Sequence, residues 1–125
     1  MRRLKYLRFG LALTMLGLVA VSRATPSPGA SQEVEHLLNF ILNSGCQFYR
    51  NGSWYDSKRG EEHLRSKDDD LAKHAEISVA EDFIDKAASK SSLSGLAYQV
   101  KCGAGDPMTS AQWLRQELIR FRAGP

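Results

Sequence analysis

Three histidines are the residues of this 125-residue chain best suited to acid–base or metal chemistry, and their spacing limits what they can do. His63 and His74 are 11 residues apart, so an unbroken helix would place them on one face but about 16 Å apart along its axis. They cannot share a metal ion, because ligand atoms lie about 2 Å from it. His36 adjoins an apolar helical stripe, where a packed or surface histidine is expected. We therefore predict no metal site and no cofactor.

A serine hydrolase site is the catalytic alternative. Its nucleophile would be Ser91, Ser92 or Ser94, with His63 as the base and an aspartate of the run 68–70 as the orienting acid. Nucleophile and base must share a hydrogen bond, and the chain contains neither a G-x-S-x-G nor an S-x-x-K motif. Loop serines commonly hold turns and cap helices. We predict no catalytic residue, with a weak hydrolase-type site as the alternative.

A polar patch that binds a small anion is a second hypothesis. Cations, hydroxyls and amides can together hold a carboxylate, and the sequence places such groups at a hairpin tip, on one helical face and in a serine-rich loop. Each residue also has a purely structural alternative, as a turn residue, a helix–sheet contact or a solvated side chain. The candidate patch consists of Arg50, Asn51, Trp54, His63, Lys67, Ser91 and Ser92.

Aromatic residues in the predicted strands support the leading functional hypothesis. Alternation along a strand sends them to both faces of the sheet, and helices can cover one face. An exposed aromatic patch with a polar rim would bind a protein or peptide, as would an unpaired edge strand. We therefore favour a non-enzymatic interaction or accessory module of the cell envelope, the alternative being that these side chains fill the core. The aromatics concerned are Phe48, Tyr49, Trp54, Tyr55, Tyr98 and Trp113.

The first 24 residues have the layout of a secretory signal peptide. A basic start is followed by an apolar stretch over residues 9–21, and Ser22 and Ala24 are the small residues that a signal peptidase requires. That stretch has 13 residues, whereas a membrane-spanning helix needs about 20. We predict cleavage after Ala24 and a periplasmic protein without a stable membrane anchor, the alternative being an uncleaved anchor. Residues 25–30, rich in proline and glycine, are predicted to form a flexible tether.

Removal of this leader changes the charge of the protein. Five of the 17 basic residues lie in the leader and all 14 acidic residues follow it, so residues 25–125 carry a net charge of −2. The pI near 9.0 therefore comes mainly from the leader. A slightly acidic domain without a basic run gives no electrostatic indication of nucleic-acid binding.

The two cysteines are predicted to form a disulfide. Outside the cytoplasm such a pair is more often bridged than free. A bond between Cys46 and Cys102 would close a loop of 56 residues, which contributes about 4 kcal/mol in the chain-entropy model. Two buried thiols or one reactive thiol are the alternatives.

Periodicity and turn residues predict a single α+β domain over residues 31–125. Asn51-Gly52 between aromatic-rich segments is a strong signal for a hairpin, and capping boxes begin at Ser78 and Thr109. The aspartate run 68–70 disfavours a continuing helix, so the second helix either breaks there or runs on. The order α-β-β-α-α-β-α has about four helices and a three-stranded antiparallel sheet, its helices beginning at residues 31, 57, 78 and 109 and its strands covering 47–50, 53–55 and 96–102.

Several strings in this order resemble the YfeK-like family of small periplasmic proteins, which carry a domain of unknown function. The resemblance covers residues 33–122 and implies an exported single domain, with the disulfide as a feature of a subgroup. It implies no activity. The strings are SGCQFYRNGSWYD at 44–56, EEHLRSK at 61–67, AEDFIDKAASKSSLSG at 80–95 and YQVKCG at 98–103.

Overall fold

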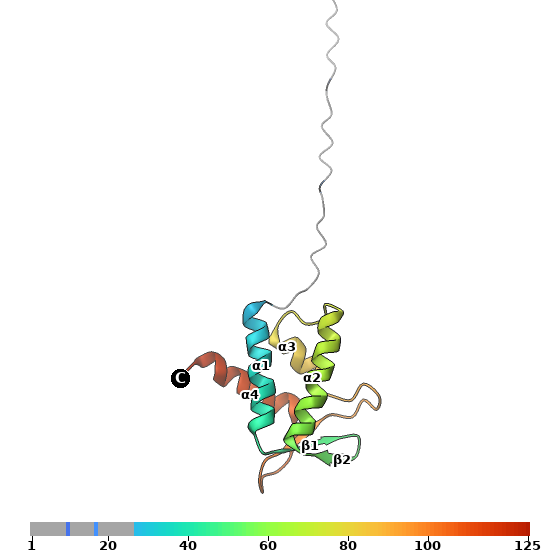
Figure 1. Ribbon diagram of the computed structural model, residues 1–125, viewed down its shortest axis with the longest axis vertical. Coiled ribbons are helices and arrows are strands. Elements are labelled where there is room, and N and C mark those ends of the chain that lie inside the picture. The colour runs from blue at the N-terminus through green and yellow to red at the C-terminus, as the bar shows by residue number, and fades with distance from the viewer. Residues whose placement is uncertain (1–9, 11–16, 18–26) are drawn as a thin grey trace, which may run out of the picture.

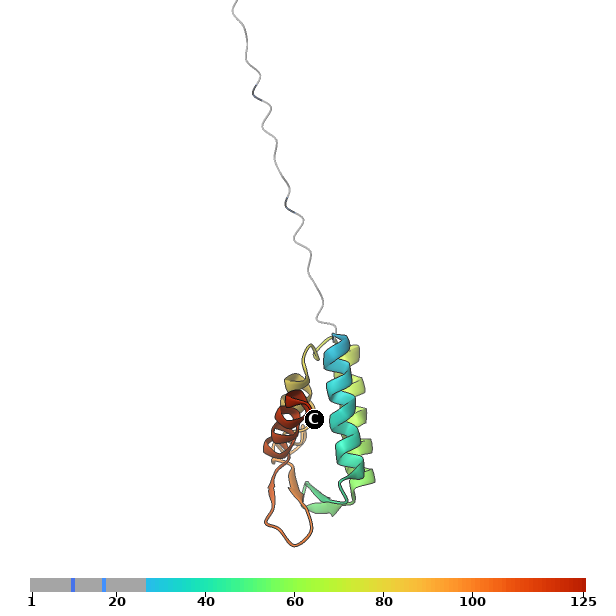
Figure 2. The same ribbon diagram turned by 90° about the vertical axis from the view of Figure 1, so that its left-hand side faces the viewer.

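The computed structural model describes residues 27–125 and the isolated positions 10 and 17. Apart from these two positions, the predicted signal peptide lies outside the described residues, and so do the first two residues of the predicted tether. The fold has two helical layers and a small sheet at one end (Figures 1 and 2). Helices α1 and α2 lie side by side in one layer, and α3 and α4 form the other. The prediction of a small α+β domain is confirmed.

Helix α1 (Pro28–Asn43) begins three residues before the predicted start at Ser31. The Ser27 hydroxyl accepts the N–H of Ala30, and proline is well suited to the first turn because its missing N–H is not needed there. The last three residues of the predicted tether are therefore helical. The apolar stripe faces the core, with Val34, Leu37, Leu38 and Ile41 all buried.

Helix α2 (Ser57–Lys73) runs through the aspartates 68–70 without a break. Asp56 caps its start by accepting the N–H of Arg59. Leu64 is buried and Leu71 packs against the core. Burial of this stripe against α1 outweighs the unfavourable placement of acids near the negative end of a helix, which costs about 0.3–1 kcal/mol per charge.

The β-hairpin is confirmed. Strands β1 (Gln47–Arg50) and β2 (Ser53–Tyr55) pair antiparallel, and the two turn residues Asn51 and Gly52 have φ values of 50° and 89°. Positive φ at both central positions is what a type I′ turn requires. Gly60 lets α2 lie close to this hairpin, since a Cβ there would come 2.9 Å from the ring of Phe48.

The sheet has four strands, so the prediction of three is wrong. Strand β3 (Gln99–Lys101) pairs with β1 on one side and with β4 (Met108–Thr109) on the other, giving the antiparallel order β2-β1-β3-β4. Strand β4 has only two residues and follows a glycine-rich segment, so it carries no alternation that a sequence pattern could reveal. Its existence depends on the partner that β3 provides.

The third helix is short and irregular. Helix α3 (Ala80–Asp82) continues into a π-helical turn, η1 (Phe83–Ala87). The Asp82 carboxylate accepts the N–H groups of Ser78 and Val79 and so caps its start. Phe83 and Ile84, both fully buried, fix this segment in the core together with α4 (Ser110–Ala123), whose start Thr109 caps.

The predicted disulfide joins Cys46 and Cys102. Both cysteines flank the register pair Gln47–Lys101 of strands β1 and β3, so the bond links two neighbouring strands at the point where their pairing ends. No helix of the described residues is long and apolar enough to cross a membrane.

Candidate functional site

Two cavities lie between the β-hairpin and α2, and they share Arg50, His63 and Tyr98 as lining residues. The loop around Ser91 lines the smaller one. The smaller has a volume of about 200 Å³ and the larger about 480 Å³. The structure brings six of the seven residues of the predicted patch together around the smaller cavity: Arg50, Asn51, His63, Lys67, Ser91 and Ser92.

Trp54 is the member of the predicted patch that does not join them. Register places it opposite Tyr49, and the two rings lie 5.4 Å apart between centroids. Alternation sends this pair to the sheet face opposite Phe48, which is buried in the core. Trp54 is 42% exposed, so the aromatics divide between the two faces as predicted.

A chain of hydrogen bonds links the polar residues around the smaller cavity. The Nη1 of Arg50 lies 2.5 Å from Nδ1 of His63, and Nε2 of His63 lies 3.1 Å from the hydroxyl of Tyr98. The ammonium of Lys67 donates to the same hydroxyl at 3.2 Å and to the carbonyl of Lys90 at 3.1 Å. We call Arg50, His63, Lys67 and Tyr98 the His63 cluster.

His63 is neutral at physiological pH. Burial, followed by the nearby charges of Arg50 and Lys67, lowers its pKa to about 4. A neutral imidazole has one donor and one acceptor nitrogen, and arginine can only donate. Nδ1 is therefore the acceptor, and Nε2 carries the hydrogen that it donates to Tyr98.

Tyr98 is then an acceptor of two hydrogen bonds, from His63 and from Lys67. Burial raises the pKa of Tyr98, so its phenol is protonated at neutral pH. With both lone pairs occupied, its hydroxyl hydrogen is available to a further acceptor. Burial, followed by the charge of Arg50, lowers the pKa of Lys67.

The smaller cavity presents more hydrogen-bond donors than acceptors. Nε of Arg50 is buried and has no partner among the described residues, and the hydroxyl hydrogen of Tyr98 is free. No carboxylate of the described part of the chain lines this cavity. A buried donor without a partner costs about 1–3 kcal/mol, so the cavity favours a ligand that supplies acceptor atoms.

The loop serines hold the loop and do not form a catalytic pair. Ser91 is 3% exposed, and its hydroxyl accepts the N–H groups of Leu93 and Ser94. The hydroxyl of Ser94 donates to the side-chain oxygen of Asn51 at 2.5 Å, which ties the loop to the hairpin tip. Within the described residues, both ring nitrogens of His63 contact other partners. The arrangement that the hydrolase alternative requires is therefore not formed.

The larger cavity combines residues that the sequence had named for other roles with residues that it did not single out, among them Arg59, Leu64 and Ser110. Aromatic and aliphatic side chains of Phe48, Tyr55 and Leu64 line it together with two guanidinium groups, and Arg50 and Arg59 lie 5.5 and 6.0 Å from the Tyr55 ring centroid. Arg59 is four residues before His63 on the same helix, so helical spacing was the available signal. For Tyr98, the only signal in the sequence was the alternation of polar and apolar residues along its predicted strand.

Residues 28–122 match a family described as "Family of unknown function (DUF5329)". The chain belongs to this family. No curated protein and no solved structure matches it. All residues of the site described above lie within the part of the chain that matches the DUF5329 family.

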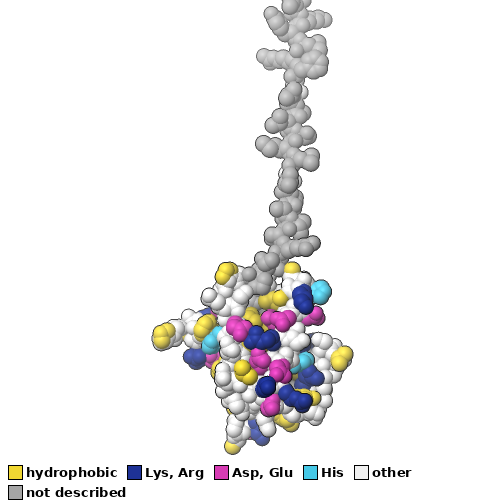
Figure 3. Space-filling model, viewed as in Figure 1, with side chains coloured by type: hydrophobic (Ala, Val, Ile, Leu, Met, Phe, Trp, Pro, Cys, Tyr) yellow, Lys and Arg dark blue, Asp and Glu magenta, His cyan; other side chains and the backbone are white. Residues whose placement is uncertain are grey.

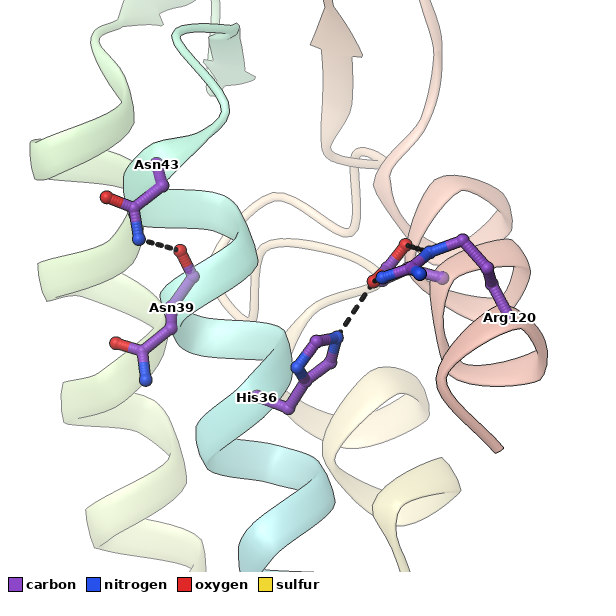
Figure 4. Close-up of polar contacts among 5 residues, drawn as sticks. His36, Asn39, Asn43 and Arg120 are labelled. Atoms are coloured by element: carbon purple, nitrogen blue, oxygen red, sulfur yellow. Dashed lines mark hydrogen bonds and ion pairs between the residues drawn. The ribbon is translucent and has the colours of Figure 1, made fainter. Parts of the chain in front are cut away.

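A second histidine lies at the contact between α1 and α4, where Figure 4 shows His36 pointing toward the helix that carries Arg120. His36 Nε2 lies 2.8 Å from a carboxylate oxygen of Glu117, and Arg120 Nε donates to the other oxygen at 2.8 Å. The His36 ring stacks on Phe121 with centroids 3.9 Å apart. We call His36, Glu117 and Arg120 the His36 cluster.

Some charges elsewhere on the domain form ion pairs between helices. Acidic and basic side chains are mixed across the face formed by α1 and α2 (Figure 3). Arg65 of α2 donates to Glu35 of α1 at 2.9 Å and to Glu61 at 2.6 Å. Glu61 is 6% exposed, so this ion pair lies partly in the interior. Across the described residues, no group of three or more His, Cys, Asp or Glu side chains is arranged to hold a metal ion.

Proposed function

We propose that this chain is an exported, non-enzymatic protein of the cell envelope that binds a small anion where the two cavities meet. The observation that carries the proposal is the donor surplus of the His63 cluster. Arg50, Lys67 and Tyr98 all line one small space, and between them they carry more hydrogen-bond donors than the acceptors that line it. Carboxylate and phosphate oxygens accept hydrogen bonds without donating any, so an anion satisfies this site.

Because His63 is neutral, the positive charge of the site comes from Arg50 and Lys67 on either side of it. Protonation would add a third positive charge between Arg50 and Lys67, and the lowered pKa shows that the fold opposes it. The neutral imidazole instead lies between the two cations and donates a hydrogen bond to the hydroxyl of Tyr98. A cationic ligand would be repelled, and a neutral alcohol would satisfy fewer donors.

Titration calorimetry with acetate and with inorganic phosphate tests this proposal. We expect at least one to bind, with an affinity that falls as salt is added, and we expect Lys67→Met to weaken binding about tenfold or more. Lys101→Met is the matched control, since Lys101 belongs to β3 but does not line either cavity. Equal weakening by both variants would point to a general charge effect and contradict the proposal.

Export to the periplasm, and the closer relationship to the YfeK-like proteins, belong to the same proposal. The leader pattern of residues 1–24 supports export, and the Cys46–Cys102 bond suits an oxidising compartment. Terminal sequencing of the protein from a periplasmic fraction should begin close to Thr25. Recovery of the intact leader on cytosolic protein would contradict export.

A second candidate function is contact with an extended peptide segment of an envelope protein. Strand β2 is an edge of the sheet, and Trp54 on it is 42% exposed beside Tyr49. A partner strand could pair with this edge and pack on the aromatic rings. A photo-crosslinking residue in place of Trp54 should give an adduct with an extended segment of the partner. The same residue in place of Leu93, which is 94% exposed, should give none; adducts at both or at neither count against this function.

A further inference from the structure

The larger cavity adds an apolar compartment to the anion site. Its volume of about 480 Å³ falls within the range of roughly 300–1,000 Å³ typical of small-molecule sites. Rings of Phe48 and Tyr55 and the side chain of Leu64 line it. Arg50 and Tyr98 line both cavities, so an anionic group bound there lies beside an apolar space far larger than acetate needs.

Another residue that lines this cavity has a buried polar atom without a partner. Ser110 lines the larger cavity and is 1% exposed, and its hydroxyl has no hydrogen-bond partner among the described residues. Arg50 also lines this cavity, and its Nε is likewise buried and without a partner among the described residues. Most buried polar groups in native proteins are hydrogen-bonded, so the pair indicates a cavity built to receive a ligand.

The charges around the larger cavity select the charge of that ligand. Arg50 and Arg59 contribute two positive charges and Glu62 one negative charge, while His63 is neutral. A single negative charge on the ligand brings this lining to neutrality. A carboxylate carries one charge, whereas a phosphate monoester carries about 1.5–2 at neutral pH.

We propose that the ligand is a monocarboxylate with an apolar body of several carbon atoms, its carboxylate at Arg50 and its body in the larger cavity. This inference rests on the proposed anion-binding function and names its ligand class. Tyr55, stacked near the guanidinium groups of Arg50 and Arg59, forms the wall that distinguishes a long body from a short one.

Calorimetric titration with acetate, butyrate, hexanoate and octanoate tests the inference on the purified protein. We expect affinity to rise about two- to fourfold for each CH₂ group added, the factor expected for burial of a CH₂ group. Hexanamide, which has a similar body but no charge, should bind at least tenfold more weakly than hexanoate. Equal affinities along the series would overturn the apolar body while leaving the anion site intact. Equal binding of hexanamide and hexanoate, or binding of no carboxylate and no phosphate, would overturn both.

Neighbouring residues of β2 provide the matched variants. Tyr55→Ala should weaken hexanoate binding about tenfold and leave acetate binding unchanged, whereas Trp54→Ala, on the opposite face, should change neither. Tyr55→Leu gives the same comparison with a milder change if Tyr55→Ala does not fold. Equal weakening of acetate and hexanoate by the Tyr55 variant that folds would overturn the assignment of this wall to the ligand body.

Discussion

The His63 cluster and the His36 cluster each place a partly buried histidine between two elements, but their surroundings have opposite charge. His36 faces the carboxylate of Glu117, which Arg120 also contacts. The hydrogen bond from Arg120 holds the pKa of Glu117 below its usual value against the raising effect of burial, and His36 adds to the lowering. His63 lies between two cations, and burial lowers its pKa to about 4.

The difference separates a structural contact from a site. In the His36 cluster, donors meet the oxygens of one carboxylate, and the contact joins α1 to α4. In the His63 cluster, most donors also have acceptors, but Nε of Arg50 and the hydroxyl hydrogen of Tyr98 have none among the described residues. Hydrogen bonds that are fully made stabilise the fold, whereas unmet donors lower stability unless a ligand binds. The two clusters should therefore respond in opposite ways to mutation.

Of the changes considered, removal of the disulfide should lower the free energy of unfolding most. Replacing Cys46 and Cys102 together with serine should lower the free energy of unfolding by about 4 kcal/mol, because a loop of 56 residues is no longer closed in the unfolded chain. Urea unfolding measures the loss. Hydrogen exchange should rise more around β1 and β3, next to the His63 cluster, than at the α1–α4 contact; a uniform rise would contradict this coupling.

Removal of the shared carboxylate should break the His36 cluster. Glu117→Ala should cost about 2 kcal/mol of unfolding free energy, since a buried carboxylate that accepts hydrogen bonds from charged Arg120 and contacts His36 is lost. Glu81→Ala is the control, because Glu81 pairs with Arg122 at an exposed position and should cost less than about 0.5 kcal/mol. Anion binding should be unchanged in both variants.

The two clusters should lose their contributions to stability in different pH ranges. The pKa of His63 is about 4 in the folded protein and about 6.5 unfolded, so the unfolded state binds the proton first as pH falls. Stability present above pH 6.5 is then lost between about pH 6.5 and 4, by about 1–2 kcal/mol after allowance for partial exposure. Glu117, with its lowered pKa, contributes stability that is lost only below about pH 4.5.

Urea unfolding at pH 7 and pH 5 measures this difference. The wild type should lose more stability between the two pH values than His63→Gln does. Asp68 has a raised pKa, caused first by burial, and acts in the opposite direction, but its contribution is common to both proteins and cancels. Equal losses in wild type and variant would contradict the neutral state of His63.

The smallest effect on stability should come from the His63 cluster itself. Lys67→Met removes one of two like charges near His63 and keeps the aliphatic stem, so unfolding free energy should stay within about 0.5 kcal/mol or rise slightly. Mutation of a residue whose role is to bind a ligand should weaken binding without lowering the stability of the fold. A loss of 2 kcal/mol or more would place Lys67 with Glu117 among the structural contacts.

Local signals predicted the helices and the hairpin, whereas the disulfide was predicted from the expected oxidising compartment. Asn51-Gly52 was sufficient for the turn because few residues tolerate positive φ at both positions. Thr109 was identified as a cap from its own motif. Local signals failed for β4, a two-residue strand that exists only because β3 lies beside it, and for the π-helical turn at Phe83, which packing in the core holds.

Only part of the candidate patch was predicted, again because the sequence reports local features and not tertiary contacts. Residue type was sufficient to nominate Arg50 and Lys67 as anion ligands, but it also nominated Trp54, which the strand register places on the other face. Tyr98, which accepts from both His63 and Lys67, was assigned to the group of sheet aromatics. Its place in the site depends on how β3 lies against α2, and no spacing along the chain encodes that.

The sequence by itself determined which segments become helix or hairpin, because caps, turn residues and apolar periodicity act over a few residues, but it placed the starts of α1 and α3 only to within two or three residues. Only the tertiary structure decided which polar side chains meet without an acceptor. That outcome arises where a hairpin, a helix and a serine loop converge from positions 50, 67 and 91. Burial there lowers the pKa of one histidine, while a carboxylate brought from position 117 satisfies the other.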